Sequence, residues 1–515
     1  MKHYAIGIGG TGAKCMEAFV HLCAAGIIDG EIFSLFIDPD SANYLLERAT
    51  KAFNTYIKCK GTNVSGIDFM RARINAPDPM VWPLFDTNVQ PDLSSYFQYT
   101  NMHNIRTEAA HLFDTLYTKA EKETTLERGF RGHPAIGAAI MASIAQTKNE
   151  PWGTFCDRLV QDLGSGEDIK IFIFGSVFGG TGASGLPTIA RVINNLITDG
   201  GSKKSAKGTV KIGCAMLLPY FSFVSSDNDN ELKAKSENFI VNTQAALKYY
   251  HQMKRMDIYD AVYLLGTETQ SPVSVASTGG REQKNDPHFI ELYAALAAFD
   301  FFKATNYNRS AMYRVLGREK NNRVDWEDLP DNETRSMIKS KILNLTRFAF
   351  AYLNFYYPML GDIDKRGAFY KAPWYVDIFE RCGEKLLSDK TKASLLDLKG
   401  YSEQYLSWLA NIHKSARDVN VNLINCNAFS YTVDENGRTK TELLADFRRE
   451  HFDDLLLPAT NTPTDGLNGL WHRICETALE KDNSLNALGR FIKVLYNSCS
   501  VIKNNKPLQE RASTR

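Results

Sequence analysis

The sequence predicts an α/β fold with a doubly wound, mostly parallel sheet, a long central helix and a largely helical C-terminal region. Through about the first three hundred residues, short runs rich in Ile, Val and Phe alternate with stretches of helical apolar spacing. Strands buried between two layers of helices have this composition, because both of their faces are apolar.

Five apolar runs bounded by turn residues are predicted strands: Tyr4–Ile8, Ile32–Ile37, Ile169–Phe174, Val210–Leu218 and Ala261–Leu265. Between them, helical spacing predicts helices at Ala13–Ala25, Gly137–Gln146, Leu186–Ile197 and Glu231–Met253. Strands and helices that alternate in this way are typical of a parallel sheet.

An almost wholly apolar segment from Pro287 to Phe302 predicts a central helix that is buried on most sides. Further helices are expected at Glu333–Tyr356, Leu395–His413, Glu442–Leu456 and Leu485–Asn504, and an edge strand at Ala428–Val433. The predicted divisions are an α/β domain (1–286), a central segment (287–357), a mostly helical C-terminal domain (358–504) and a disordered tail (505–515).

The 515 residues include 60 Lys and Arg and 59 Asp and Glu, which gives a formal net charge of +1. This balance supplies no overall attraction to nucleic acid or to an acidic membrane surface. The nine cysteines are scattered without a Cys-x-x-Cys pair, and no apolar run approaches the ~20 residues that span a bilayer. We expect a cytoplasmic protein with no membrane span and no nucleic-acid partner.

Two glycine-rich loops follow predicted strands and precede predicted helices. The first is Gly7-Ile8-Gly9-Gly10-Thr11-Gly12, and the second is Gly179-Gly180-Thr181-Gly182-Ala183-Ser184-Gly185. Glycine lets the backbone approach an anion, and the N–H groups at a helix N-terminus supply donors and positive dipole. Both loops therefore predict phosphate binding, although a tight turn without a ligand is the simpler reading of either loop alone.

The first loop by itself fits the G-x-G-x-x-G pattern of dinucleotide-binding enzymes, with Asp38 or Asp40 after the next strand as a ribose partner. A P-loop fits poorly, because Ala13 separates Gly12 from Lys14 and no Ser or Thr follows to hold magnesium. Neither pattern explains the second loop.

The second loop resembles the signature of the tubulin and FtsZ GTPases, G-G-G-T-G-[ST]-G, and is followed by Pro187. Other segments resemble further nucleotide loops of that family in the same order, over residues 3 to 330 or so. They include Ile37-Asp38-Pro39-Asp40, Arg131-Gly132-His133-Pro134-Ala135-Ile136-Gly137 and Leu217-Leu218-Pro219-Tyr220. The chain is thus similar to a divergent bacterial tubulin-like protein, with residues 1–286 as its nucleotide-binding domain.

This resemblance implies a GTP or GDP site. Its residues would be Gly9, Gly10, Thr11, Gly12, Asp40, Arg131, Gly132, His133, Gly179, Gly180, Thr181, Gly182, Ala183, Ser184, Pro219, Asn238 and Asn242. Several have plainer readings. Asp40 could cap a helix beginning near Ser41, His133 could be satisfied by backbone, and Arg131 and the two asparagines could be solvated.

The family's catalytic loop after the central helix reads N-x-D-x-x-D, and its acidic residues reach the nucleotide of the adjacent subunit. Asp325 and Asp328 keep this two-carboxylate spacing, with Arg323 in place of the asparagine. Paired carboxylates can orient a water or hold a cation such as Mg²⁺. A charged surface turn is the alternative reading of the same residues.

The resemblance implies a GTPase activated by self-assembly into filaments or oligomers, with GTP hydrolysed at the subunit interface. Two alternatives stay open: a nucleotide-regulated binding or defence module with little hydrolysis, and a dinucleotide oxidoreductase built on the first loop. Phe178 occupies the position where the family signature begins with glycine and would narrow the loop or alter the approach of phosphates. The helical C-terminal region offers a surface for protein partners.

Overall fold

The computed structural model describes most of the chain. The described residues are 1–60, 67–85, 91–126, 130, 133–147, 149–199, 209–223, 236–252, 255–267, 270–273, 281, 284–306, 312–315, 323–324, 326, 332–361, 371–383, 387–414, 420–421, 423–425, 429–433, 439–443, 452, 455–456, 466–478 and 485–500.

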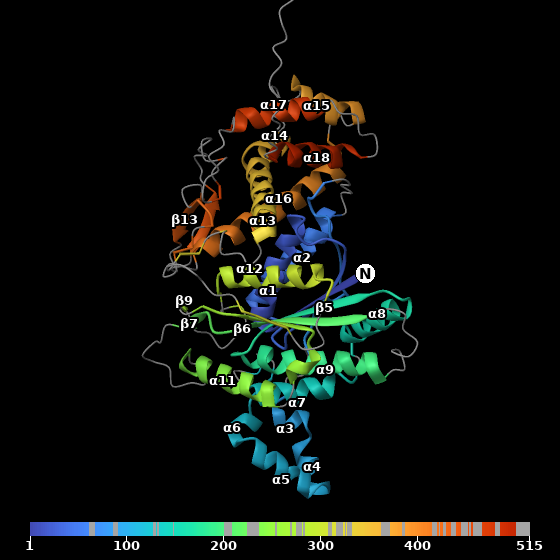
Figure 1. The fold of residues 1–515 in the computed structure, drawn as a ribbon, viewed down its shortest axis with the longest axis vertical. Helices are drawn as coiled ribbons and strands as arrows, with labels where there is room; N and C mark the ends of the chain where they lie inside the picture. Colours follow the sequence, from blue (N-terminus) through green and yellow to red (C-terminus); the bar gives the residue numbers. More distant parts are fainter. Residues whose placement is uncertain are drawn as a thin grey trace, which may run out of the picture.

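A central sheet of eight strands organises the molecule (Figure 1). Its strands are β1 (Lys2–Ile8), β2 (Glu31–Ile37), β3 (Arg73–Asn75), β4 (Val81–Trp82), β5 (Ile169–Ser176), β6 (Val210–Leu217), β8 (Ala261–Leu265) and β10 (Met312–Val315). They lie in the order β10-β8-β6-β5-β1-β2-β3, with β4 also paired to β2, and each of these pairs is parallel. The five predicted strands and the parallel α/β sheet are confirmed.

Helices cover both faces of the sheet. One face carries α1 (Gly9–Ala24), α2 (Tyr44–Lys60) and α12 (Phe289–Lys303), and the other carries α7 (Pro134–Ile144), α9 (Gly180–Asp199) and α11 (Ser236–Gln252). Alternate β5 side chains enter the two cores: Phe172 and Phe174 pack with the α1 and α12 side, and Ile171 and Ile173 with the α9 side. This double burial explains why most positions of the central strands are apolar, with exceptions such as Lys170 of β5.

The predicted central helix is present as α12. Its N-terminus has a capping box in which the His288 side chain accepts from the Ile290 N–H and the Glu291 side chain accepts from the His288 N–H. At its other end, Lys170 Nζ of β5 donates to the carbonyl oxygens of Phe302 at 2.7 Å and Ala304 at 2.6 Å. A buried lysine at a helix C-terminus complements the negative end of the helix dipole.

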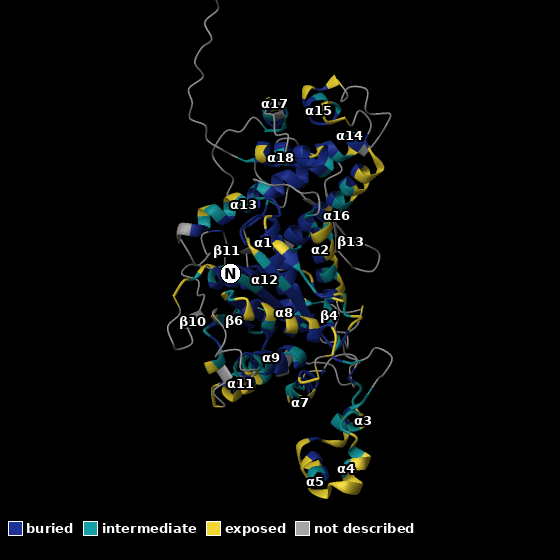
Figure 2. Ribbon diagram, turned by 90° about the vertical axis from the view of Figure 1, so that its right-hand side faces the viewer, coloured by how far each residue is buried: buried dark blue, intermediate teal, exposed yellow. Residues whose placement is uncertain are grey.

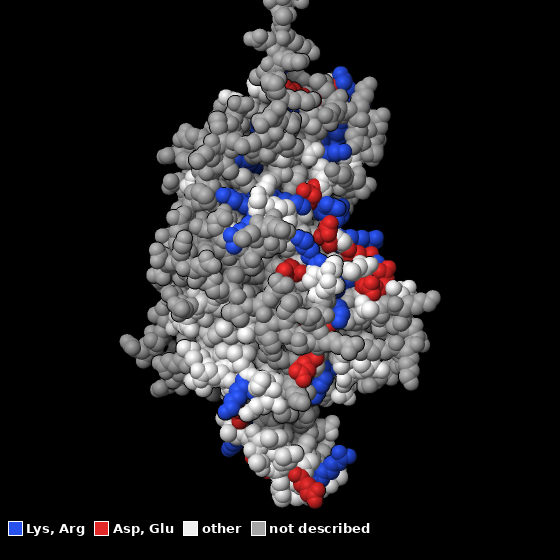
Figure 3. All heavy atoms as spheres, viewed as in Figure 1, with Lys and Arg blue, Asp and Glu red and all other residues white. Residues whose placement is uncertain are grey.

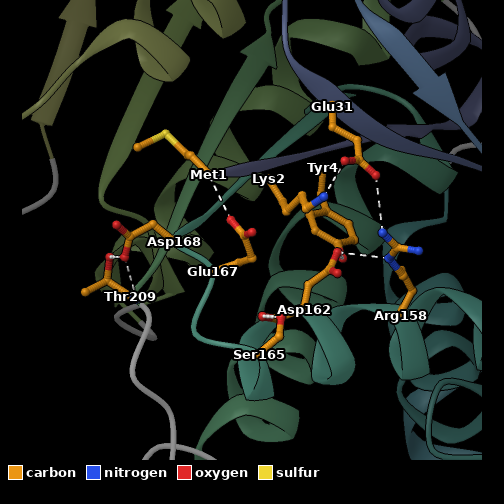
Figure 4. A network of polar contacts seen from close by, with 10 residues as sticks. All are labelled: Met1, Lys2, Tyr4, Glu31, Arg158, Asp162, Ser165, Glu167, Asp168 and Thr209. Carbon is orange, nitrogen blue, oxygen red and sulfur yellow. Dashed lines mark hydrogen bonds and ion pairs between the residues drawn. The ribbon is translucent and has the colours of Figure 1, made fainter.

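A polar network ties the amino ends of the central strands together (Figure 4). Tyr4 of β1 donates its hydroxyl to Asp162 Oδ2 at 2.7 Å, and Arg158 Nε donates to the same oxygen at 3.0 Å. Arg158 also contacts Glu31 Oε1 of β2 at 3.3 Å. All of these strands run in the same direction. The network at their amino-terminal ends therefore lies at the opposite end of the strands from the glycine-rich loops, which follow their carboxyl-terminal ends.

A lobe of short helices projects from the sheet on its α7 and α9 side (Figures 1 and 2). It consists of α3 (Leu93–Tyr96), α4 (Tyr99–Ile105), α5 (Thr107–Leu116) and α6 (Lys119–Lys122). The sequence did not predict this lobe, nor α8 (Trp152–Gly164).

The C-terminal region lies beyond α1 and α12, on the opposite side of the sheet from the lobe. Its helices are α13 (Asn332–Ala351), a π-helical segment (Tyr352–Tyr356), α14 (Tyr357–Gly361), α15 (Pro373–Ile378), α16 (Asp389–Lys414), α17 (Gly466–Ala478) and α18 (Ala487–Cys499). Three small sheets pair β7 (Phe221–Phe223) with β9 (Ser271–Val273), β11 (Arg323–Val324) with β12 (Asn420–Val421), and β13 (Phe429–Val433) with β14 (Thr439–Leu443).

The helix predicted at Glu442–Leu456 is wrong at both of its ends, and residues 444–451, 453 and 454 lie outside the described residues. Glu442 and Leu443 end strand β14, which pairs antiparallel with β13, and Leu456 forms an isolated bridge with Ile424. Two threonines in Thr439–Leu443 favour the extended chain, and pairing with the predicted edge strand places Glu442 and Leu443 in a strand.

Charges are mixed on the face of the molecule shown in Figure 3, where basic and acidic side chains of the described residues are interspersed. This distribution agrees with the balanced composition. Among the described helices, none combines the length and the apolar character needed to cross a membrane.

Candidate functional site

The carboxyl ends of β1 and β5 form the switch point of the sheet. The two strands are parallel neighbours, with Lys2 opposite Ile169 and Gly7 opposite Phe174. β1 leads into α1 on one face and β5 leads into α9 on the other, so the connections diverge between them. Ligands of doubly wound sheets bind outside the carboxyl ends of the strands at such a point. Both glycine-rich loops lie there.

The two loops touch each other. Gly9 has a φ of +70°, and a Cβ atom placed on it would lie 3.3 Å from Thr181 Cβ and 3.6 Å from Gly182 N. A side chain at Gly9 would therefore be both strained and crowded by the second loop. At Gly182, a Cβ would lie 2.5 Å from the Ser176 carbonyl oxygen. These glycines allow the N-termini of α1 and α9 to meet at the carboxyl ends of β1 and β5.

The first loop is itself the first turn of α1, four residues earlier than the sequence predicts. Gly9, Gly10, Thr11 and Gly12 occupy this turn, and among the described residues no side chain caps it. Gly10 and Thr11 are half-buried, whereas Gly9 and Gly12 are buried. The turn thus presents uncapped N–H donors at its most accessible positions, as a helix N-terminus that binds an anion must.

The second loop opens α9 at Gly180. Gly179 and Thr181 are half-buried, and the remaining residues through Ser184 are buried. Ser184 turns inward, where its hydroxyl donates to the Gly180 carbonyl oxygen at 2.8 Å. Pro187 has no N–H for the Ala183 carbonyl, and the Tyr250 hydroxyl of α11 donates to that oxygen instead. The accessible part of this loop is therefore Gly179 and Thr181.

Phe178 points away from the loop and into the core. It is 3% exposed, and its ring lies 5.0 Å from that of Phe239 and 5.5 Å from that of Phe221. These rings come from α11 and β7. The aromatic side chain at the start of the signature thus joins the second loop to α11 by packing.

The loop after β2 lies against the first glycine-rich loop, because a Cβ on Gly10 would lie 3.0 Å from Asn43 Nδ2. Asp38 is 3% exposed; its Oδ1 accepts from the Asp40 N–H at 3.0 Å and its Oδ2 accepts from Asn43 Nδ2 at 3.2 Å. Burial, and then the nearby charge of Asp40, raise the pKa of Asp38 to about 8.

Asp40 is also buried, at 5% exposure. The reading of Asp40 as the cap of a helix near Ser41 is wrong, because α2 begins at Tyr44. The Asn43 side chain takes that place and accepts from the Leu45 N–H at 2.9 Å.

The third predicted loop is described only in part, since Arg131 and Gly132 lie outside the described residues. His133 immediately precedes α7 and is half-buried, and its Nδ1 lies 3.1 Å from Glu121 Oε1 of the lobe. Its ring is thus engaged by the lobe. The helix that follows packs tightly on the second loop, because a Cβ on Gly137 would clash with Ser184 Oγ.

The predicted sugar and base residues lie on β6 and α11. Pro219 is half-buried in the turn after β6, and Asn242 is half-buried on α11. Asn238 also lies on α11, but its side chain is outside what the structure describes. The Phe178 and Tyr250 contacts hold α11 against the second loop.

Asp325 and Asp328 lie outside the described residues. Their neighbours are anchored to the C-terminal region. Val324 pairs with Val421 in a short parallel ladder, and Trp326 is 1% exposed and donates its indole N–H to the Leu423 carbonyl oxygen at 3.1 Å.

Sequence reasoning missed a buried charged cluster behind the first loop. Lys14, which the P-loop reading would direct to a phosphate, turns into the core and forms an ion pair with Glu291 of α12. The Tyr220 hydroxyl donates to Glu291 Oε1 at 2.7 Å. The only sequence signal was the presence of charged residues within two largely apolar segments, and such a signal does not identify which of them pair. Among the described residues, no three His, Cys, Asp or Glu side chains gather as a metal site.

Comparisons with known proteins give no assignment. No protein-family model and no curated protein matches the chain. Among solved structures, it is similar to CetZ2 from Haloferax volcanii, described as a GTPγS-bound protofilament, with 15% identity over 58% of this chain and 57% of that one and a TM-score of 0.28. It is also similar to CetZ from Methanosaeta thermophila strain DSM 6194, with 13% identity over 60% of this chain and 57% of that one and a TM-score of 0.24. The matched region thus spans little more than half of each protein, and similarities this low assign neither a family nor a function.

Proposed function

We propose that this chain is a GTP-binding, tubulin-like protein that self-assembles into filaments or oligomers and hydrolyses GTP at the interface between subunits. One observation carries the proposal: the two glycine-rich loops meet, Gly9 against Thr181, at the switch point of a parallel sheet. A single-loop dinucleotide enzyme does not require the second loop to be there. A site that holds a chain of phosphates between two helix N-termini does.

The phosphate groups would be held mainly by backbone N–H groups. α1 and α9 each carry about half a positive charge at the N-terminus from their aligned peptide dipoles. The half-buried residues at these two ends are Gly10, Thr11, Gly179 and Thr181. The buried members, Gly9, Gly12, Gly180, Gly182, Ala183 and Ser184, would shape the loops without side-chain contact to the ligand.

The remaining predicted residues would surround the sugar and the base. Asp40, Arg131, Gly132 and His133 would flank the phosphates and the ribose, and Pro219, Asn238 and Asn242 would contact the sugar and the purine edge. An amide can both donate to and accept from a purine, which suits the two asparagines to that role.

Hydrolysis would use Asp325 and Asp328 of a neighbouring subunit to orient the attacking water, with Mg²⁺ bound beside the phosphates. The anchoring of Val324 and Trp326 to the C-terminal region supports a fixed start for this acidic segment. The helices of residues 358–504 would add contacts to protein partners.

Turnover measured against protein concentration tests the proposal. A GTPase whose site is shared between subunits turns over GTP more than in proportion to protein concentration, and light scattering rises with it. Saturable GTP binding with negligible, concentration-independent turnover would instead select a nucleotide-regulated binding module. Binding of a nicotinamide dinucleotide that GTP does not compete away would contradict the proposal.

A further inference from the structure

The side-chain amide of Asn43 lies beside the first glycine-rich loop. A Cβ atom placed on Gly10 would be 3.0 Å from Asn43 Nδ2. Because the Cα–Cβ bonds of a helix tilt toward its N-terminus, Asn43 Nδ2 lies on the N-terminal side of the first turn of α1. The N–H groups of this turn that have no partner within the helix point to the same side. An anion bound by them would therefore lie next to the Asn43 amide.

The orientation of this amide is fixed by its two hydrogen bonds. Asn43 Oδ1 accepts from the Leu45 N–H at 2.9 Å, and Asn43 Nδ2 donates to Asp38 Oδ2 at 3.2 Å. A backbone N–H can only donate, so the atom that caps α2 must be the amide oxygen. Asp38 is held in turn, because its Oδ1 accepts from the Asp40 N–H at 3.0 Å. The amide nitrogen therefore stays on the side of Gly10.

One donor of this nitrogen is left for a ligand. An amide nitrogen carries two N–H donors, and among the described residues Asn43 Nδ2 donates only to Asp38. Asn43 is half-buried, as are Gly10 and Thr11. A ligand at the first turn of α1 can thus reach the second N–H.

The surroundings of this donor suit an anion. The N-terminus of α2, a helix of 17 residues, begins next to Asn43 and adds a third positive helix end to those of α1 and α9. Lys14 of α1 turns into the core, where it pairs with Glu291, so it does not take this position. A neutral N–H donor beside three helix N-termini fits a phosphate oxygen.

The capping role alone does not account for the amide nitrogen. A helix cap needs only a side-chain oxygen, and Ser or Asp caps a helix about as well as Asn. The bond to Asp38 uses one of the two amide protons. The second proton has no role in either contact.

We propose that Asn43 is a further binding residue of the nucleotide site, and that its amide nitrogen donates to a phosphate oxygen of the nucleotide held at the first glycine-rich loop. The proposal rests on the proposed function, and it adds a side-chain contact from the loop after β2 to a site built mainly of backbone N–H groups. The ligand group it assigns to Asn43 is the phosphate, not the sugar or the base.

Equilibrium titration of a fluorescent GTP analogue tests this assignment. Asn43→Ser keeps an oxygen to cap α2 but removes the amide, and it should weaken binding by roughly 10- to 100-fold, the range for a hydrogen bond to a charged group. Asn43→Asp also keeps the cap and should weaken binding further, because its carboxylate would repel the phosphate.

Asn486→Ser is the matched control. Asn486 caps α18 in the C-terminal region, where its Oδ1 accepts from the Gly489 N–H at 2.7 Å. This variant makes the same exchange at another helix cap and should bind the analogue as the parent protein does. Thermal unfolding without nucleotide should show that both Ser variants are folded at the temperature of the titration.

Asp38→Ala separates the two contacts of the amide nitrogen. It removes the acceptor at Asp38 and leaves the Asn43 amide in place, so its loss of affinity should be smaller than that of Asn43→Ser. Equal losses in these two variants would assign the effect to the contact with Asp38 and overturn the proposal. Parental affinity in Asn43→Ser would also overturn it. A parent protein that binds no GTP would refute the proposed function itself, and this assignment with it.

Discussion

Gly9 and Thr181 belong to different βα units, yet they lie so close that a Cβ atom placed on Gly9 would be 3.3 Å from the Cβ of Thr181. This contact joins the loops after β1 and β5 into one structure. An anion bound at the first loop would therefore lie beside the second loop as well.

Gly9→Ala should abolish nucleotide binding and cost about 1–2 kcal/mol of stability, the usual penalty for a left-handed residue with a Cβ. Gly383→Ala is the matched control. Gly383 has a φ of +83° and nothing within 4 Å of a Cβ, so it carries the same backbone strain far from the loops. Thermal unfolding should show a loss of stability for both variants, somewhat larger for Gly9→Ala because its Cβ also meets Thr181, while only Gly9→Ala loses nucleotide binding. Equal nucleotide affinity in the two variants would show that the close approach of the two loops at Gly9 is not needed for nucleotide binding.

The buried carboxyl of Asp38 should make stability depend on pH. Its pKa in the folded protein is about 8, against an ordinary value of 3.8, so the folded state holds a proton that the unfolded state releases. Stability should therefore fall as pH rises from about 4 toward 8, by ~1.4 kcal/mol for each pH unit at most. Urea unfolding of Asp38→Asn should show a flatter profile than the parent protein. Parallel profiles would mean that Asp38 is ionised in the folded state.

Tyr4→Phe should lower stability without affecting the nucleotide site. It removes the buried hydroxyl that donates to Asp162 Oδ2 at the amino edge of the sheet, at a cost of about 1–2 kcal/mol. Urea unfolding gives the loss, and nucleotide titration should give the affinity of the parent protein. A parallel loss of nucleotide affinity would show that the network at the amino-terminal ends of the strands is coupled to the nucleotide site at their carboxyl-terminal ends.

Asp325→Ala should leave GTP binding intact and slow hydrolysis in the assembled state by roughly 10²-fold, the scale for loss of a group that stabilises the transition state. Glu327→Ala, a neighbouring carboxylate outside the two-aspartate spacing, is the control and should turn over normally. Turnover of sedimented assemblies distinguishes the two variants. Equal rates for Asp325→Ala and the parent protein would leave this segment as a charged surface turn.

Five of the eight strands of the sheet could be predicted from sequence, because those five are mostly apolar and are bounded by turn residues. The other three, β3, β4 and β10, have only two to four residues each and contain no apolar run long enough to predict a strand. Ala261–Leu265 is observed with the predicted bounds, and the first two strands are longer by one or two residues. The lobe could not, because α3 and α6 have only four residues each, too few for a helical period to appear.

The site could be predicted only where it is built from local sequence. The two loops carry their glycine pattern within a few residues, and the structure brings them together. By contrast, the pairing of Lys14 with Glu291 and the inward turn of Phe178 depend on elements far apart in the chain. Local spacing contains no information about such partners.

Competitive equilibrium titration of the purified protein with GTP, GDP and NAD⁺ tests the central claim most directly. The two joined loops predict saturable binding of one GTP per chain, displaced by GDP and not by NAD⁺. Displacement by NAD⁺, or no saturable binding of any guanine nucleotide, would contradict the assignment of these loops to a GTP site.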